Sequence, residues 1–243
     1  MENKFLYIKK QCKKCNGKGY IWSNDRHIFG QEEKDPIQCE CLKKMMLYMH
    51  LHSANVSREY YDLTMSDFNA GIHKDKIVLK PRIQKMVDDP DDLFRRGRGI
   101  FFYGTNGTGK TMLSIEILKA AVKHKYSIHY EFYPIVYETF LKKGYKADDL
   151  KEKMDNIFSN VDFLVLDEIG KELDGSHASK SASEKLLEIH ILKKRADKVT
   201  ILISNKSPEE IQEIYGKSVF SMLSLNHDFI QVPGHDYRGD INA

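Results

Sequence analysis

Residues 100–111 read Ile-Phe-Phe-Tyr-Gly-Thr-Asn-Gly-Thr-Gly-Lys-Thr, an apolar run followed by a glycine-rich turn that ends in lysine and threonine. From Gly104 to Thr111 the turn satisfies the pattern G-x-x-x-x-G-K-S/T at every fixed position. The apolar residues before it predict a short buried strand, and the periodic apolar residues after it predict a helix. These flanks distinguish the turn from a chance glycine-rich loop.

The composition of this turn is that of a phosphate-binding loop. Glycines let the backbone fold tightly, so that consecutive N–H groups point at phosphate oxygens, and the start of the helix adds partial positive charge. We expect Lys110 to reach the β and γ phosphates and the Thr111 hydroxyl to bind Mg²⁺. The residues expected to bind ATP in this loop are Gly104, Thr105, Asn106, Gly107, Thr108, Gly109, Lys110 and Thr111.

Polar residues end two further apolar runs. The run FLVL is followed by Asp167 and Glu168, and the run VTILIS is followed by Asn205. With the phosphate loop upstream, we expect Asp167 to bind Mg²⁺, Glu168 to act as general base and Asn205 to orient the attacking water. The alternatives are a solvated acidic turn and an ordinary turn asparagine. Arg238, in the segment GHDYR, is expected on the γ-phosphate; the alternative is a surface arginine.

Apolar strands alternate with amphipathic helices along the rest of the chain. We expect strands at 100–103, 127–132, 161–166, 199–203 and 229–232. We expect helices at 42–53, 75–89 (entered through Pro81), 111–125, 136–160 (broken near Gly144), 183–195 and 209–225 (with a break at Gly216). Continuous apolar strands with helical crossovers predict an α/β fold with a parallel sheet covered on both faces.

The cysteines mark a second module. All four lie within the first 41 residues, as Cys12-x-x-Cys15 and Cys39-x-Cys41. Two close pairs can surround one tetrahedral Zn²⁺, and four thiolates leave no open position, so we expect structural zinc rather than a catalytic metal. We therefore predict a zinc-binding head and helix over 1–53 and an ATPase domain over 54–243.

Composition excludes some classes of protein. The 243 residues include 38 basic and 35 acidic ones, a net charge of +3 that is too mild to indicate nucleic-acid binding by itself. No apolar stretch is long enough for a membrane span, and the first residues do not resemble a signal peptide. We expect a cytoplasmic protein, in which thiols stay reduced and disulfides are not expected.

From about Val56 to Arg238 the chain resembles the DnaC/DnaI type of helicase-loader ATPase, a branch of the AAA+ family close to the DnaA initiators. The resemblance is carried by REYYDLTMSDF, YGTNGTGKT, SNVDFLVLDEIG, KKRADKVTILISN and HDYR. The head, CKKCNGKGY with QCECLKK, is similar to zinc heads of DnaI-like and phage-encoded loaders.

The resemblance implies more than spacing does. It implies a five-stranded sheet in the AAA+ order 5-1-4-3-2, with residues 60–68 near the adenine. It also implies that the head contacts a hexameric replicative helicase, that the ATPase part touches single-stranded DNA, and that the protein forms a homo-oligomer on the helicase, away from any membrane. The residues that match Walker A, Walker B, sensor 1 and sensor 2 are Lys110, Thr111, Asp167, Glu168, Asn205 and Arg238.

The chain departs from the family in the helix before the last strand. Loaders carry arginines there, one of which reaches a neighbour's ATP, whereas this helix reads SVFSMLSLN with Met222 and Ser224 at the expected positions. Lys217 and Arg195 are the remaining candidate cations, or a partner supplies one. We expect weak hydrolysis by the protein alone, with ATP acting mainly as a switch.

Three functions fit these observations. The first is an ATP-dependent loader of a replicative helicase; the second is a transposition helper ATPase of the IstB type, against which the cysteine head argues; the third is an adaptor or inhibitor of a helicase. Candidate DNA-binding cations form two clusters, Arg95, Arg96 and Arg98, and Lys142, Lys143 and Lys146, each of which can also be an ordinary solvated face. Met45, Met46 and Met49 form either a docking face or core.

Overall fold

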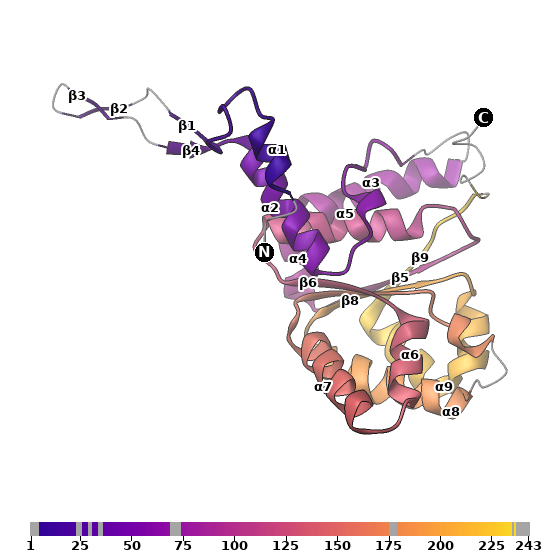
Figure 1. The fold of residues 1–243 in the computed structure, drawn as a ribbon. Helices are drawn as coiled ribbons and strands as arrows, with labels where there is room; N and C mark the ends of the chain where they lie inside the picture. The colour runs from indigo at the N-terminus through magenta and orange to yellow at the C-terminus, as the bar shows by residue number, and fades with distance from the viewer. Residues whose placement is uncertain are drawn as a thin grey trace. The chain divides into compact units, whose positions relative to one another are not determined.

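The computed structural model describes residues 5–22, 26–28, 31–33, 36–68, 74–174, 179–234 and 236 (Figure 1). The chain divides into two compact units, Met1–Ser53 and Ala54–Ala243. No helix among the described residues is both long and apolar enough to cross a bilayer.

The first unit combines two short helices with antiparallel strands. Its elements are α1 (Leu6–Lys10), β1 (Tyr20–Trp22), β2 (Arg26–Ile28), β3 (Gln31–Glu33), β4 (Pro36–Gln38) and α2 (Glu40–Ser53). β1 pairs with β4, and β2 pairs with β3. α2 buries one stripe three residues apart, Leu42, Met45, Tyr48 and Leu51. Phe5 packs edge-on against Tyr48, with ring centroids 6.1 Å apart.

The second unit is built on one parallel sheet. Its strands are β5 (Gly99–Tyr103), β6 (Ile128–Phe132), β7 (Phe163–Asp167), β8 (Val199–Ser204) and β9 (His227–Gln231). They lie in the order β6-β7-β8-β5-β9, and every neighbouring pair is parallel. Numbered from β5, this is the order 5-1-4-3-2, so the expected topology is confirmed. β7 and β8 are buried along their whole length, which explains their unbroken apolar sequences.

Helices cover both faces of this sheet (Figure 1). The first face carries η1 (Arg58–Tyr60), α3 (Lys74–Asp88), α4 (Pro90–Arg96) and α5 (Lys110–Lys123). The second carries α6 (Tyr133–Leu141), α7 (Tyr145–Asn160), η2 (Lys171–Leu173), α8 (Lys180–Lys185), η3 (Leu186–Leu192), η4 (Lys193–Arg195) and α9 (Pro208–Asn226). The core between the sheet and the second face includes Phe101, Leu164, Leu166, Leu202, Tyr133 and Tyr215.

Several expected boundaries hold, and others do not. Gly144, with φ of 104°, separates α6 from α7, and Gly216, with φ of 77° and ψ of 174°, breaks the helical backbone within α9, both as expected. The prediction that Pro81 starts a helix was wrong, because α3 begins at Lys74 and Pro81 lies inside it. Its apolar stripe of Leu79, Ile83 and Met86 spans the proline, so packing outweighs the missing N–H.

In the second unit, α4 was not among the expected helices. The acidic run Asp88-Asp-Pro-Asp-Asp92 lies at the junction of two helices, because α3 ends at Asp88 and α4 begins at Pro90. Asp89 caps α4 by accepting a hydrogen bond of 3.0 Å from the Asp92 N–H, and Pro90 occupies the first turn, where its missing N–H is harmless. The acidic run therefore both ends one helix and starts the next.

Candidate nucleotide site and cysteine cluster

The glycine-rich loop lies between β5 and α5 and depends on backbone conformations that glycine favours. Gly104, Gly107 and Gly109 have φ values of 142°, 69° and 101°. A Cβ on Gly104 would lie 2.4 Å from the carbonyl oxygen of Val232, and one on Gly109 would lie 2.9 Å from the ring of Phe68. Both the turn and the close approach of neighbouring segments therefore require glycine at these positions.

Lys110 folds back over this loop and is only 6% exposed. Its Nζ donates to the carbonyl oxygens of Gly104 and Thr105, at 2.8 and 2.7 Å, and to Asn205 Oδ1 at 2.8 Å. All three acceptors are neutral. An anionic phosphate oxygen is a stronger acceptor than any of them, because the Lys110 ammonium attracts a negative charge more strongly than a neutral oxygen.

Asp167 ends β7 beside the loop and accepts three hydrogen bonds. Its Oδ2 accepts from the Thr111 hydroxyl and from the Tyr130 phenol, each at 2.8 Å, and its Oδ1 accepts from the Glu168 N–H at 2.8 Å. The structure thus brings the Thr111 hydroxyl and the Asp167 carboxylate together. Hydroxyl and carboxylate oxygens are the hard donors that Mg²⁺ prefers, so this pair suits that ion.

Asn205 connects the lysine to the second carboxylate. While its Oδ1 accepts from Lys110, its Nδ2 donates to Glu168 Oε2 at 2.8 Å. Glu168 has a φ of 64°, an uncommon backbone conformation outside glycine, so its side chain leaves the strand in an unusual direction. Lys171 Nζ lies 3.8 Å from the same Glu168 oxygen. The ends of β7 and β8 and the first residue of α5 therefore contribute to one polar cluster.

Two other expectations concern residues around this cluster. Arg238 lies outside the described residues, so its place on the γ-phosphate stays a prediction. The segment 60–68 packs against α5 and the loop, since Lys119 Nζ donates to the Leu63 carbonyl oxygen and Phe68 lies against Gly109. Its contact with adenine likewise stays a prediction.

Arg195 is ruled out as a donor to a neighbouring nucleotide. It is 3% exposed, and burial lowers the pKa of its guanidinium to about 10, so that it stays charged at neutral pH. Its acceptors are the Thr200 hydroxyl and the carbonyl oxygens of Phe158, Val161, Asp162 and Val199. These atoms belong to the amino ends of β7 and β8 and the segment before them, opposite the edge that carries Lys110. Lys217, the other candidate, is exposed on α9.

The sequence reasoning missed two residues of this site. Tyr130 donates to Asp167, and the alternation around it in SIHYEF looks like that of any half-buried strand. Glu172 is a buried carboxylate that accepts from the Gly170 N–H at 2.8 Å, from the Ser183 hydroxyl at 2.6 Å and from the Tyr215 phenol. It fixes the turn after Glu168 against α8 and α9. In the sequence, Glu172 is only a glutamate two residues after a glycine. That pattern is too common to predict these contacts.

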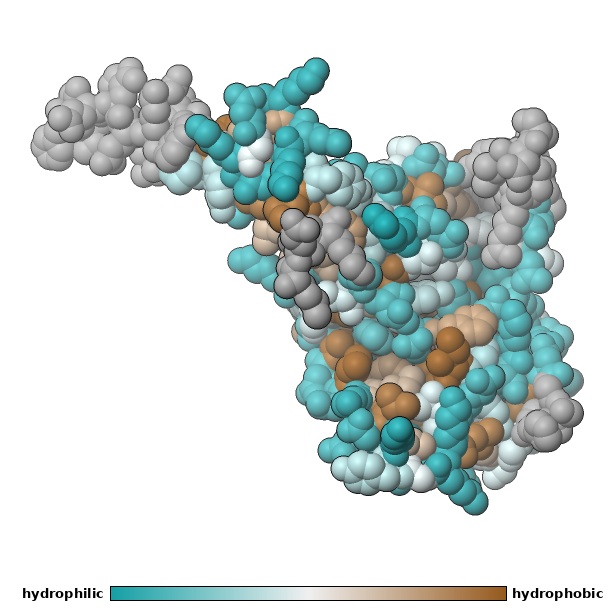
Figure 2. Space-filling view, in the orientation of Figure 1, coloured by the Kyte–Doolittle hydropathy of each residue, from teal (hydrophilic) through white to brown (hydrophobic). Residues whose placement is uncertain are grey.

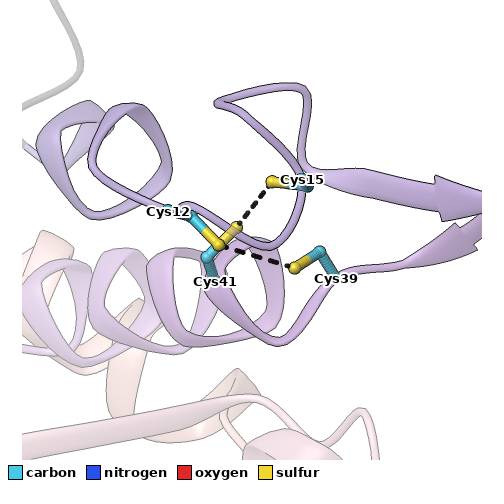
Figure 3. Close-up of side chains that lie close together, drawn as sticks. All are labelled: Cys12, Cys15, Cys39 and Cys41. Atoms are coloured by element: carbon cyan, nitrogen blue, oxygen red, sulfur yellow. Dashed lines mark hydrogen bonds between the residues drawn. The ribbon is translucent and has the colours of Figure 1, made fainter.

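In the first unit the four cysteines converge (Figure 3). Their Sγ atoms all lie within 4.8 Å of one another, with Cys12 3.8 Å from Cys39 and Cys15 3.4 Å from Cys41. A tetrahedral zinc with Zn–S bonds of about 2.3 Å separates its sulfurs by about 3.8 Å. The cluster therefore fits zinc. The Gly19 N–H also donates to Cys15 Sγ at 3.2 Å, as suits a thiolate.

The fold and the site together define a P-loop ATPase of the AAA+ type. The family model "IstB-like ATP binding protein" matches residues 79–238, and the chain belongs to this family. It is accordingly an ATP-binding protein and an ATPase.

Three solved structures with the same fold are DnaI, a DnaC helicase loader and the replication initiator DnaA. A DnaI structure matches with a TM-score of 0.60 and 18% identity over 75% of this chain and 94% of that one. A DnaC helicase loader matches with a TM-score of 0.58 and 19% identity over 73% and 100%. The initiator DnaA, bound to AMPPCP and single-stranded DNA, matches with a TM-score of 0.57 and 19% identity over 74% and 51%. A comparison with curated protein sequences found no match.

Proposed function

We propose that this ATPase loads a hexameric replicative DNA helicase onto single-stranded DNA. The observation that carries the proposal is the combination of two units in one chain. The ATPase unit has the fold of DnaI and DnaC over nearly the whole of those chains, and a cysteine-cluster unit precedes it. A separate small unit can stay bound to a partner while the ATPase unit exchanges its nucleotide.

The proposed ATP site has a division of labour. The loop from Gly104 to Thr111 and the Lys110 ammonium bind the phosphates, and bound Mg²⁺ would neutralise charge on them. Glu168 is the general base, and its Oε2 is held by the Asn205 amide, which also contacts Lys110. Because the amide touches both groups, we infer that phosphate contact at Lys110 and the orientation of Glu168 are coupled.

Hydrolysis by the protein alone is proposed to be slow. Arg195 is committed to the backbone, and the helix before β9 offers Lys217 but no arginine. A missing arginine finger costs about 10³-fold or more in turnover in other P-loop enzymes. Steady-state phosphate release should therefore be slow and should rise when the partner helicase is added.

The first unit is proposed to bind the helicase. Met45 of α2 is buried inside the unit, whereas Met46 and Met49 are exposed. Other large apolar side chains exposed on this unit are Tyr7, Tyr20 and Ile37. The methionines thus divide between core and surface, and exposed methionines form adaptable docking faces because their side chains are flexible and polarisable.

Single-stranded DNA is proposed to bind at the start of α7. Tyr145 is 90% exposed and lies among the exposed lysines Lys142, Lys143 and Lys146. An exposed aromatic ring lets a base stack, and lysines contact phosphates. Figure 2 shows apolar side chains exposed over α6 and α7 among hydrophilic ones; in the ATPase unit these include Ile135, Leu141, Leu150 and Ile157. By contrast Arg98 is engaged with Asp228 at 3.0 Å.

The test uses the full-length protein and a purified hexameric replicative helicase. We expect a stable complex by size-exclusion chromatography that is lost in the double variant Met46→Asp, Met49→Asp. The matched control Ile77→Asp, Val78→Asp changes two exposed apolar residues of the ATPase unit and should leave the complex intact. With Mg-ATP, the protein should increase helicase loading and unwinding on a single-stranded template.

Other outcomes point to the other candidates. Wild-type protein that fails to bind the helicase but binds a transposase would favour a transposition helper, which the IstB-like family match supports. Binding that stops unwinding would identify an inhibitor. For DNA, Tyr145→Ala should weaken binding of a fluorescent oligothymidine about tenfold. Tyr7→Ala, at another exposed tyrosine, should leave it unchanged.

A further inference from the structure

One carboxylate oxygen of the nucleotide site has two hydroxyl donors. Asp167 Oδ2 accepts from Thr111 Oγ1 and from the Tyr130 phenol, both at 2.8 Å. The Thr111 contact is part of the phosphate loop, but Tyr130 belongs to β6, at the edge of the sheet. We propose that Tyr130 is a positioning residue that fixes which oxygen of Asp167 faces Mg²⁺, and that it thereby sets how strongly Mg²⁺ tightens nucleotide binding.

The strand pairing places Tyr130 where this contact is possible. Tyr130 pairs with Val165 in the parallel register of β6 and β7, so both side chains, and that of Asp167 two residues on, lie on the same face of the sheet. The strand is also held from outside. The Tyr130 N–H donates to the Ala54 carbonyl oxygen at 2.9 Å, and Asn55 donates to Glu131 at 3.1 Å.

The phenol can only donate in this contact. Burial, and after it the charge of Asp167, raise the pKa of Tyr130 well above its ordinary value, so the phenol keeps its proton. An ionised carboxylate has no proton to give.

Counting acceptor sites shows what the phenol does. An ionised carboxylate offers about four lone-pair sites. On Oδ2 one goes to Thr111 and one to Tyr130, and on Oδ1 one goes to the Glu168 N–H. Oδ1 alone keeps a free site. Tyr130 thus occupies the second acceptor site of Oδ2, so that Asp167 does not rotate to present this oxygen to a cation. Oδ1 is the oxygen that remains for the cation or a water bound to it.

The substitution Tyr130→Phe removes only the hydroxyl. Asp167 keeps its charge and its bonds to Thr111 and Glu168, but it gains a second free site and rotational freedom. We expect the Mg²⁺ concentration that gives half-maximal tightening of nucleotide binding to rise about tenfold, the size of one hydrogen bond to a charged group. Nucleotide affinity in EDTA should change less than about twofold, because the Tyr130 hydroxyl donates to Asp167 and not to the phosphate-binding loop.

The experiment measures equilibrium binding of a fluorescent, non-hydrolysable ATP analogue to full-length protein in EDTA and across a Mg²⁺ titration. Tyr126→Phe is the matched control, since Tyr126 also forms a hydrogen bond with an aspartate, Asp91, on a different part of the unit. The control should leave both quantities unchanged. In an Asp167→Asn background, Tyr130→Phe should have no further effect on the Mg²⁺ midpoint.

Three results would overturn the proposal. They are an unchanged or lowered Mg²⁺ midpoint in Tyr130→Phe, an equal shift in Tyr126→Phe, and an undiminished shift in the Asp167→Asn background. The proposal rests on the ATP site and not on the helicase, so it stands or falls independently of the partner-binding tests.

Discussion

A cation is buried at each end of the parallel strands, and the two cations differ in the groups to which they donate hydrogen bonds. We refer to the end where the strands finish as the carboxyl edge and to the end where they start as the amino edge. At the carboxyl edge, Lys110 donates to two loop carbonyls and one amide, all of which belong to segments that contact a nucleotide in P-loop proteins. At the amino edge, Arg195 donates to four carbonyls and a hydroxyl that join α7, β7 and β8.

The acceptors of a buried cation show whether it can still bind a ligand. Both side chains are nearly inaccessible, so burial does not separate them. The arginine donates to four backbone carbonyl oxygens and one buried hydroxyl, and a buried polar group paired in this way has no capacity left for a ligand. The lysine has three flexible bonds to neutral acceptors, which an anion can replace.

The largest expected effect on stability is at the amino edge. Arg195→Met removes the guanidinium and leaves buried carbonyl oxygens without donors, which should lower the free energy of unfolding by about 4 kcal/mol. Chemical denaturation measures it. ATP affinity of the protein that remains folded should stay within about twofold of wild type. A stable Arg195→Met protein with weakened ATP binding would assign this arginine to the nucleotide site after all.

A second effect at the amino edge depends on pH. Burial lowers the pKa of His227, beside Arg98 and Asp228, to about 4 from 6.5. The unfolded chain therefore takes up a proton at higher pH than the folded one, so stability is complete above pH 6.5 and falls as the pH is lowered to 4. The loss should reach about 3 kcal/mol.

The measurement compares denaturation of wild type and His227→Gln between pH 7 and 4. The difference between the two proteins isolates this histidine from the carboxylates that titrate in the same range. The Arg98 guanidinium opposes protonation of His227, whereas the Asp228 carboxylate favours it, and burial outweighs both. Parallel pH profiles for the two proteins would show that His227 does not cause the loss.

At the carboxyl edge, a smaller effect is expected on turnover alone. Asn205→Ala removes the amide that contacts both Lys110 and Glu168, so turnover should fall about tenfold to a hundredfold while ATP affinity changes less than about threefold. Single-turnover hydrolysis measures it. Asn160→Ala is the control, because that side chain bonds only within α7. An equal loss of affinity and turnover would mean that Asn205 binds ATP rather than orients the reacting groups.

The sheet and the convergence of Lys110, Asp167, Glu168 and Asn205 were predictable, because their signals are local. Three glycines with a lysine specify the loop, and unbroken apolar strands indicate a buried parallel sheet. Tyr130 was not predictable, since its contact depends on which strand β6 pairs with. Arg195 was ambiguous for the same reason: a cation at the end of a helix looks the same in sequence whether it faces solvent or the ends of two strands.

The cysteine head shows the same division. Two close cysteine pairs predict a cluster, and the structure assembles it. Which methionines are buried depends on which face of α2 packs against Phe5 and α1. The sequence does not indicate that face, because Met45, Met46 and Met49 all lie within five residues of one helix. Residue type and spacing thus predict groups that share one ligand, whereas contacts between distant segments require the fold.

Binding of ATP by Lys110→Ala tests the central claim most directly, namely that the loop ending in this lysine and the carboxylates at 167 and 168 form one ATP site. Titration calorimetry with Mg-ATP should show affinity at least about a hundredfold weaker than wild type, with an unchanged free energy of unfolding in the absence of nucleotide. Undiminished retention of ATP by Lys110→Ala would contradict the account.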